Sequence, residues 1–247
     1  MANEINNQLY DTYGDRWYSA YDDPVALLRA ESKTKVPWVL EKLTAAGISR
    51  GASLLDVGCG GGFLSNALAE KDFTVTGVDI SADSLLVAAR HDRTGRARYV
   101  HGDAYALPFP DRSFAIVTAM DFLEHVEDPA RAIREISRVL QPGGLFFYHT
   151  FNRNPIAGLL VIKMVEWLVA NTPKNMHLYR MFLKPREVEK YCRENGMEVQ
   201  EVVGLRPIFS TIPIGRIFSG VVPESLTFKV VRSTLISYMG YAKKPAG

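Results

Sequence analysis

Cysteine is nearly absent from this sequence: only Cys59 and Cys192 occur among 247 residues. An extracellular fold held by disulfides needs more pairs than these two residues provide, so we expect a reduced, cytoplasmic compartment. A surplus of one charge is also missing, since 29 Lys and Arg residues stand against 27 Asp and Glu residues. Nucleic-acid binding depends on a basic surface that neutralises phosphates, and we therefore expect no nucleic-acid partner.

Long hydrophobic runs are missing as well. The best candidate for a membrane segment is 159–169 (LLVIKMVEWLV), about half the ~20 apolar residues that a spanning helix needs. It carries Lys163 and Glu166, which fall on one side of a helix and leave the other side apolar. The pattern leaves two interpretations open: a helix that packs on the core, or a helix that lies in a membrane interface.

Apolar residues make up 47% of the chain, enough for one sizeable core. From 53 to 151, short apolar runs alternate with amphipathic stretches, and this alternation predicts a doubly wound α/β fold with a mostly parallel sheet. We expect one domain, 1–247, with a helical N-terminal cap (1–45), a cofactor-binding core (53–151) and a C-terminal elaboration with the last two strands (152–247).

The cap is expected to be helical in pieces, interrupted at Pro24 and Pro37. Ser81 and Pro129 stand where helices begin, as an N-cap and as a first-turn proline. Strands are expected at 53–57, 73–80, 97–103, 114–120, 143–151, 197–205 and about 232–242, and helices at 62–70, 81–90, 128–140 and 184–195.

The segment 54–68 (LLDVGCGGGFLSNAL) places glycines at alternate positions, starting at Gly58, directly after an apolar strand. The dinucleotide-binding motif G-x-G-x-x-G would need a glycine at the position of Phe63, so its spacing fails. The observed spacing favours a ligand whose amino-acid portion lies against the turn. Asp56 would attract its ammonium group, and the following helix N-terminus would attract its carboxylate.

Two more acidic residues follow the next two strands. Asp79 stands where a carboxylate can accept hydrogen bonds from both hydroxyls of a ribose. Asp103 stands where it can accept one from an adenine amino group. Each residue alone could be a helix cap, but one nucleoside with an amino-acid tail satisfies all three acids, and the pattern predicts S-adenosylmethionine as the cofactor.

Four segments carry a family resemblance: LLDVGCGGG, VTGVDIS, GDAYALPFPDRSFAIV and LEHVEDPARAIREISRVLQPGG. They resemble the class I S-adenosylmethionine-dependent methyltransferases. The resemblance implies a Rossmann-like sheet of seven strands whose last strand runs antiparallel. The cofactor contacts that it implies are Asp56, Gly58, Gly60, Asp79, Ile80, Asp103, Ala104 and Met120.

Further on, 150–160 (TFNRNPIAGLL) and 169–199, which begins VANTPKNMHLYRMFLKP, are similar to the O-methyltransferases of ubiquinone biosynthesis. That family methylates polyprenyl catechols and hydroquinols, so the resemblance implies a phenolic hydroxyl of a lipophilic quinol as the acceptor. It also implies that Arg29 grips the carboxylate of the cofactor. A lipophilic acceptor predicts peripheral contact with the inner face of a membrane, through 155–170 and 206–231.

A phenol must lose its proton during methylation, which requires a general base or a metal ion. The segment 120–126 (MDFLEHV) places Asp121, Glu124 and His125 after the fourth strand. Two roles stay open for them: catalytic residues with His125 as the base, or ligands of a divalent cation such as Mg²⁺. The cation is implied by the family's Glu-x-x-Glu-His motif, in which Asp121 here replaces the first Glu. A structural role for His125 is also open, and His149 and His177 are secondary candidates.

Two other functions fit the same residues. The protein could methylate a different small molecule, with 206–231 as a lid over the substrate. It could also bind the cofactor without catalysis, as a scaffold or sensor, because a fold alone does not settle function. Tight cofactor binding without methyl transfer to any catechol would favour this last alternative.

Overall fold

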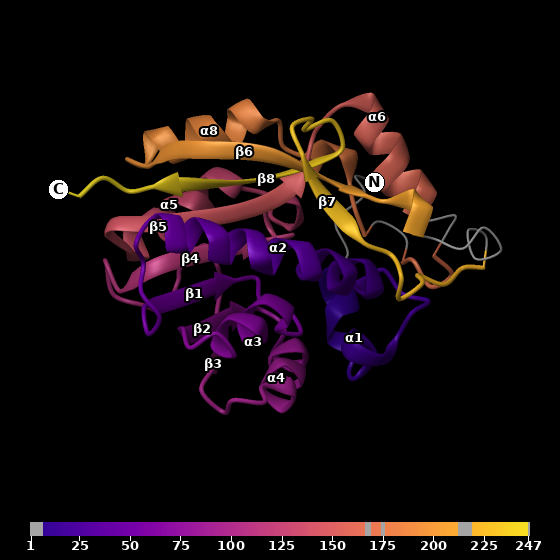
Figure 1. Ribbon diagram of the computed structural model, residues 1–247, viewed down its shortest axis with the longest axis horizontal. Coiled ribbons are helices and arrows are strands. Elements are labelled where there is room, and N and C mark those ends of the chain that lie inside the picture. The colour runs from indigo at the N-terminus through magenta and orange to yellow at the C-terminus, as the bar shows by residue number, and fades with distance from the viewer. Residues whose placement is uncertain (1–6, 166–168, 174–175, 212–218, 247) are drawn as a thin grey trace.

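The computed structural model describes residues 7–165, 169–173, 176–211 and 219–246. Within these ranges the chain forms one mixed sheet with strand order β3-β2-β1-β4-β5-β8-β6-β7. Helices cover both faces of this sheet (Figure 1). The doubly wound α/β fold expected from the sequence is confirmed.

The strands are β1 (Ser53–Val57), β2 (Thr74–Asp79), β3 (Arg98–His101), β4 (Phe114–Met120), β5 (Leu140–Phe151), β6 (Glu198–Pro207), β7 (Phe228–Val231) and β8 (Ser237–Lys243). The α-helices are α1 (Arg16–Ser19), α2 (Val25–Ala45), α3 (Phe63–Ala69), α4 (Ala82–His91), α5 (Pro129–Val139), α6 (Pro155–Ala157) and α8 (Pro185–Glu194). The 3-10 helices are η1 (Asn7–Thr12), η2 (Leu123–His125), η4 (Tyr179–Met181) and η5 (Phe209–Thr211), and η3 (Gly158–Met164) is a π-helix.

Strands β1 to β5 are mutually parallel. Both faces of the central strands β1, β4 and β5 are largely buried, whereas the edge strand β3 is not. Helices α2 and α3 cover one face through Trp38 and Leu68, and α5 and α8 cover the other through Ile136 and Val188. The short apolar runs of the sequence are therefore strands enclosed on two sides, as parallel strands usually are. Their carboxyl ends come together at one edge, where a ligand site is expected.

The expected helix starts are confirmed. The Ser81 hydroxyl accepts a hydrogen bond from the Ser84 backbone N–H and caps α4, and α5 begins at Pro129 after the cap residue Asp128. The expected interruption at Pro37 is wrong, because α2 continues through it to Ala45. Pro37 removes one backbone hydrogen bond of the helix, but the adjacent Trp38 is buried against the sheet, and this burial offsets the loss.

The expected number of seven strands is also wrong. Strand β8 runs antiparallel between β5 and β6, as the resemblance implied, but the additional strand β7 pairs with the end of β6. The reason lies in the length of β6, which continues to Pro207 and offers a free edge to the β-branched and aromatic residues of 228–231. Part of the expected substrate lid is thus a strand, and 212–218 lie outside the described residues.

The apolar segment after β5 begins with α6 and continues as η3. Its side chains divide between core and surface: Val161 is buried, whereas Ile156 and Leu159 are about half exposed. Glu166, on which the expected amphipathic pattern partly rests, lies outside the described residues. Among the helices that the structure describes, none combines the length and hydropathy needed to cross a bilayer.

Candidate active site

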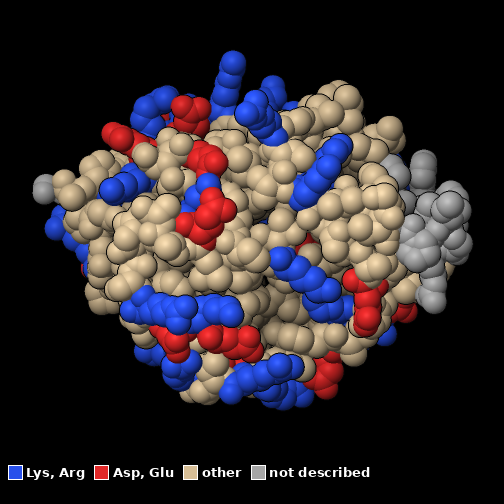
Figure 2. Space-filling view, in the orientation of Figure 1, with Lys and Arg blue, Asp and Glu red and all other residues tan. Residues whose placement is uncertain are grey.

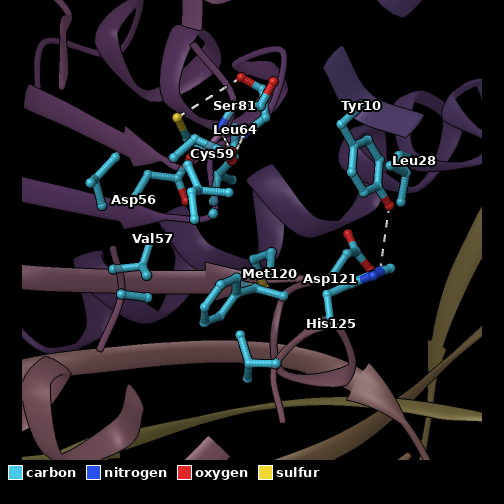
Figure 3. A pocket seen from close by; sticks show the side chains of 18 of the residues that line it. Tyr10, Leu28, Asp56, Val57, Cys59, Leu64, Ser81, Met120, Asp121 and His125 are labelled. Carbon is cyan, nitrogen blue, oxygen red and sulfur yellow. Dashed lines mark hydrogen bonds between the residues drawn. The ribbon is translucent and has the colours of Figure 1, made fainter. Parts of the chain in front are cut away.

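A cavity of about 340 Å³ lies at the carboxyl ends of β1, β2 and β4. Figure 3 shows Asp56, Cys59 and Ser81 toward one end of this cavity, and Tyr10 and His125 toward the other. We call the first the cofactor end and the second the acceptor end. The cavity is lined by all the expected cofactor residues except Arg29, namely Asp56, Gly58, Gly60, Asp79, Ile80, Asp103, Ala104 and Met120.

The glycine-rich turn at the cofactor end is packed between two aromatic rings. Gly58 and Gly60 have φ values of +69° and +49°, which favour glycine. A Cβ on Gly58 would lie 2.3 Å from Cδ2 of Phe122, and one on Gly60 would lie 2.8 Å from Cη2 of Trp17. The spacing of the glycines therefore reflects both the turn geometry and the close approach of side chains from distant segments.

Asp56, two residues before this turn, links β1 to α3 and β4. One carboxylate oxygen accepts a hydrogen bond from the Ser65 hydroxyl at 2.6 Å, and the other accepts one from the Thr118 hydroxyl at 2.7 Å. Burial raises the pKa of Asp56 to about 6, against the effect of these two hydroxyls. Asp56 lines the cavity as expected, and its direct contact with an ammonium group stays a prediction.

Asp79 and Asp103 lie at the strand ends where the sequence predicted them. The Asp79 carboxylate accepts hydrogen bonds from the backbone N–H groups of Gly60 (2.8 Å) and Ser81 (2.9 Å), and burial raises its pKa. Asp103 is exposed at the rim and accepts from the Tyr105 N–H at 2.8 Å. Because a carboxylate offers about four acceptor positions, both residues retain capacity for ligand hydroxyl or amino groups.

Arg29 does not lie where the resemblance implied. Its guanidinium donates to the backbone carbonyls of Trp17 at 2.9 Å and Ala20 at 2.6 Å, and it packs over the Tyr21 ring. These carbonyls belong to the end of α1 and reach Arg29 from the same N-terminal cap. The carboxylate contact expected of Arg29 is therefore not supported, and its place in the fold is to fasten α1 to α2.

Aromatic side chains of the cap form a roof that runs from the glycine-rich turn to the acceptor end, and the sequence alone did not identify it. Tyr10 stacks on Trp17 with ring centroids 5.7 Å apart, and the Trp17 ring meets Phe63 edge-on at 5.6 Å. The Tyr18 hydroxyl donates to the Gly61 carbonyl. Trp17 Nε1 is buried and has no hydrogen-bond partner within the described parts of the chain. The high density of aromatic residues in 10–21 is the sequence feature that could have predicted this aromatic cluster.

At the acceptor end, His125 and Asp121 line the cavity. Burial lowers the pKa of His125 to about 4, against the opposite effect of the Asp121 carboxylate, so its imidazole is neutral at neutral pH. Tyr10 Oη lies 3.5 Å from His125 Nε2, and the His177 ring lies 5.4 Å from the His125 ring. Burial, together with His125, lowers the pKa of His177 to about 3.

Glu124 is directed away from the cavity and into the core, where it is 1% exposed. Burial and the neighbouring Asp121 raise its pKa to about 8. The Thr150 hydroxyl is near enough to lower that pKa but does not meet normal hydrogen-bond geometry. A contact of Glu124 with a substrate is therefore not supported.

Asp121 belongs to a buried ionic cluster that includes a residue the sequence did not identify, Lys35. Lys35 Nζ donates to both carboxylate oxygens of Asp121, at 2.6 and 2.7 Å, and to Glu31 at 2.5 Å. His149 Nδ1 lies 2.5 Å from Asp121 Oδ1, and His149 is fully buried. Burial opposes the charge on Lys35, but the two carboxylates outweigh it and raise its pKa.

The expected metal ligands Asp121, Glu124 and His125 do not form one donor set. Among the described residues, the ligand-type atoms that lie within 4.8 Å of one another belong to Glu31, Asp121 and His149. The ammonium group of Lys35 is bonded to both carboxylates of this set, and a divalent cation beside it would be repelled. The residues present therefore do not fit a divalent cation, contrary to the expectation.

Comparison with known proteins agrees with this geometry. A methyltransferase domain family matches residues 55–148. The ubiquinone biosynthesis O-methyltransferases of Pseudomonas entomophila and Pseudomonas aeruginosa are 35% and 36% identical to the chain over 200 residues, 79% of this chain and 84% of theirs. The magnesium protoporphyrin IX methyltransferase of Synechocystis PCC 6803, solved with bound SAH, matches with a TM-score of 0.61 at 18% identity, over 99% of this chain and 90% of that one.

The fold and the cavity are those expected of a methyltransferase, in agreement with the names of these relatives. The glycine-rich turn and the acidic residues at the ends of β1 and β2 line a single cavity, and the relatives that share most of the chain's length are O-methyltransferases. The chain belongs to the family of S-adenosylmethionine-dependent methyltransferases that includes these ubiquinone biosynthesis O-methyltransferases.

Proposed function

We propose that the protein transfers a methyl group from S-adenosylmethionine to a phenolic hydroxyl of a lipophilic quinol or polyprenyl catechol. The observation that carries the proposal is the acceptor end of the cavity, where the neutral imidazole of His125 lies beside the ionised carboxylate of Asp121. These are two hydrogen-bond acceptors of the kind that a catechol needs for its two O–H groups. The names of the curated relatives support the same acceptor class.

The residues at the cofactor end suit S-adenosylmethionine. Asp79 would accept from the ribose hydroxyls, and Ile80, which is 67% exposed at the rim, offers an apolar surface for the adenine. The buried Nε1–H of Trp17 would donate to the carboxylate of the cofactor in place of Arg29. When bound, the cofactor supplies an electrophilic methyl group on a positively charged sulfur.

The acceptor end then requires a group that takes the phenolic proton. His125 is the residue that we assign to this role, because its imidazole is neutral and lines the cavity. The phenolic oxygen forms a bond to the methyl carbon as the bond between carbon and sulfur breaks, and the proton passes to His125. Asp121 stabilises the imidazolium that results, since its carboxylate favours the protonated form.

A surface next to the acceptor end suits the lipophilic part of such a substrate. Ile156, Leu159, Tyr179 and Leu235 are between 42% and 56% exposed. Their segments are adjacent, because a Cβ on Gly158 would lie 2.8 Å from Cδ2 of Tyr179, and the Asn154 side chain donates a hydrogen bond to the Leu235 carbonyl. We call these four residues the apolar patch. Its helix η4 packs beside η2, which carries His125, so a lipid tail bound there would point its head group toward the cavity.

An assay with isotopically labelled S-adenosylmethionine tests the proposal. We expect methyl transfer to a catechol with a short prenyl tail, with a lower KM than that for unsubstituted catechol. Transfer only to tail-less or non-phenolic small molecules would favour the second function, with 206–231 covering a different substrate. Tight cofactor binding without transfer to any catechol would favour a scaffold or sensor.

A further inference from the structure

We propose that Lys35 is a built-in cation at the acceptor end, which takes the place of a divalent metal ion and fixes Asp121 to recognise a hydroxyl next to the methylated one. The second part of this inference rests on the proposed function, because it concerns a catechol. The first part concerns the cluster of Glu31, Lys35, Asp121 and His149 alone. Lys35 is a positioning residue, and Asp121 determines specificity.

The first observation is the location of the ammonium group. Lys35 Nζ lies 2.5 Å from Glu31 Oε2 and 2.6 Å from Asp121 Oδ2, and the Lys35 side chain is only 3% exposed. Glu31 and Asp121 are 11% and 17% exposed. Two carboxylates at this depth require a compensating positive charge, and Lys35 provides it at the position where a cation would bind both.

The second observation is that the same donors would suit a metal ion if Lys35 were removed. One ligand atom each from Glu31, Asp121 and His149 lies within 4.8 Å of the others. The two carboxylates suit Mn²⁺, and the imidazole offers a third ligand atom. Lys35 and Asp121 also line the cavity, so an ion could reach this position from solvent.

The third observation is how Lys35 uses its hydrogen bonds. An ammonium group has three N–H donors, and the structure shows three contacts, one to Glu31 and two to Asp121. Lys35 therefore acts on a substrate through Asp121. Lys35 and His149 occupy three of the about four acceptor positions of the Asp121 carboxylate. The remaining position, on Oδ2, would accept a hydrogen bond from a hydroxyl adjacent to the reacting one, while the reacting hydroxyl donates to His125.

The backbone of Asp121 supports this assignment. Its φ of +56° is a left-handed conformation that is uncommon outside glycine. Asp is one of the few other residues that tolerate it. Lys35 and His149 hold the side chain from two sides. The arrangement is specific for a carboxylate at this position, which agrees with a role in substrate selection.

The test removes the built-in cation and asks whether a metal ion replaces it. For Lys35→Ala we expect Mn²⁺ binding by isothermal titration at least tenfold tighter than for the unaltered protein. The matched control Lys35→Ala/Asp121→Asn removes one ligand charge and should lose this gain. Equal Mn²⁺ affinity in Lys35→Ala and in the control would overturn the inference. Because no substrate is present, this result is independent of the proposed function.

The unaltered protein provides a second readout, which holds even if Lys35→Ala does not fold. With a catechol that it methylates, we expect the same rate in EDTA and in Mg²⁺, and a rate at least tenfold higher for catechol than for the matching monophenol. Lys35→Ala should lose that preference, and Mn²⁺ should restore it. Loss of the unaltered protein's activity in EDTA and its recovery with Mg²⁺ would overturn the inference.

Discussion

His125 shows how one residue's environment decides its chemistry. Burial lowers the pKa of its imidazole to about 4, so the imidazole is in its neutral, proton-accepting form throughout the neutral range. Glu124, its neighbour in sequence, is neutral for the same reason, although the shift has the opposite direction, since burial raises its pKa to about 8. The sequence offers both Glu124 and His125 as catalytic candidates, but His125 lines the cavity and Glu124 is buried in the core.

We predict that His125→Ala lowers the rate of methyl transfer by roughly 10²-fold or more, as expected for loss of a general base. The rate of the variant should rise with pH, because the phenol must then ionise on its own with a pKa near 10. The rate with His125 intact should be almost constant above about pH 5. Initial rates from pH 6 to 9 provide the measurement.

The exposed His101, at the end of β3 and outside the cavity lining, provides a matched control. His101→Asn should keep the rate and the pH profile of the unaltered protein. A His125→Ala variant with an unchanged rate and a flat profile would assign His125 a structural role.

A substitution of Trp17 tests the proposed hydrogen bond between its Nε1–H and the carboxylate of the cofactor. Trp17→Phe keeps an aromatic ring against Tyr10 and Phe63 but removes the buried Nε1–H. A hydrogen bond to a charged group contributes about 1.5–3 kcal/mol, so we expect S-adenosylmethionine to bind at least tenfold more weakly in calorimetry. Trp38→Phe, in the core between α2 and the sheet, should bind as before. Equal affinities for both variants would show that Trp17 does not contact the carboxylate.

At the scale of elements, sequence patterns predicted β1 to β5 within a few residues. The apolar runs of β1 and β4 are largely buried and are followed directly by Gly58 and Asp121, so local information is sufficient for them. The sequence patterns failed where contacts between distant segments determine the secondary structure. The burial of Trp38 carries α2 through Pro37, and the free edge of β6 creates β7.

The candidate site also contains residues that the sequence predicted and residues that it did not. The cofactor residues follow predictable strands, whereas Lys35 meets Asp121 across 86 positions of the chain. Neither residue carries a local signal of that contact. The aromatic roof over the glycine-rich turn depends in the same manner on packing between the N-terminal cap and the core.

The segment α6 and η3 carries the prediction about membranes. We expect the protein to co-sediment with vesicles of phosphatidylethanolamine and phosphatidylglycerol through the apolar patch. Leu159→Asp places a charge in this patch and should reduce the bound fraction several-fold, because charged groups disfavour an apolar interface. Leu86→Asp, an equally exposed position on α4, should sediment as before. Equal sedimentation of both variants would contradict the role of the patch.

At the scale of the whole molecule, positive and negative charges are balanced on the surface, and a few charged or ionisable side chains are buried. Figure 2 shows positive and negative side chains intermixed on the face toward the viewer, in keeping with the net charge of +2. The ionic cluster around Lys35 and the buried Glu124 instead lie beneath the surface. Dependence of stability on pH should therefore originate largely from interior groups.

We predict that Glu124→Gln becomes more stable relative to the unaltered protein as pH rises. The pKa of Glu124 is about 8 in the fold and 4.5 ordinarily, so only the unfolded chain releases its proton between these values. The contribution of Glu124 to the free energy of unfolding of the unaltered protein is therefore complete below about pH 4.5 and is lost as pH rises through 8. Urea unfolding at pH 5 and pH 9 should show a relative gain on the order of 4 kcal/mol.

The exposed Glu70 serves as the control for this measurement. Glu70→Gln should change the free energy of unfolding by a similar small amount at both pH values. A Glu124→Gln variant whose relative stability does not change with pH would show that the carboxyl group is ionised in the fold.

The fastening of α1 by Arg29 has a consequence for the timing of the catalytic cycle. Trp17 covers the glycine-rich turn, and its own carbonyl is held by Arg29. In the proposed binding mode the spent cofactor would leave from beneath that ring, so the lifetime of the product complex would depend on how long the two hydrogen bonds from Arg29 persist. A residue that contacts neither reactant would in this way set the residence time of the product and limit the turnover rate.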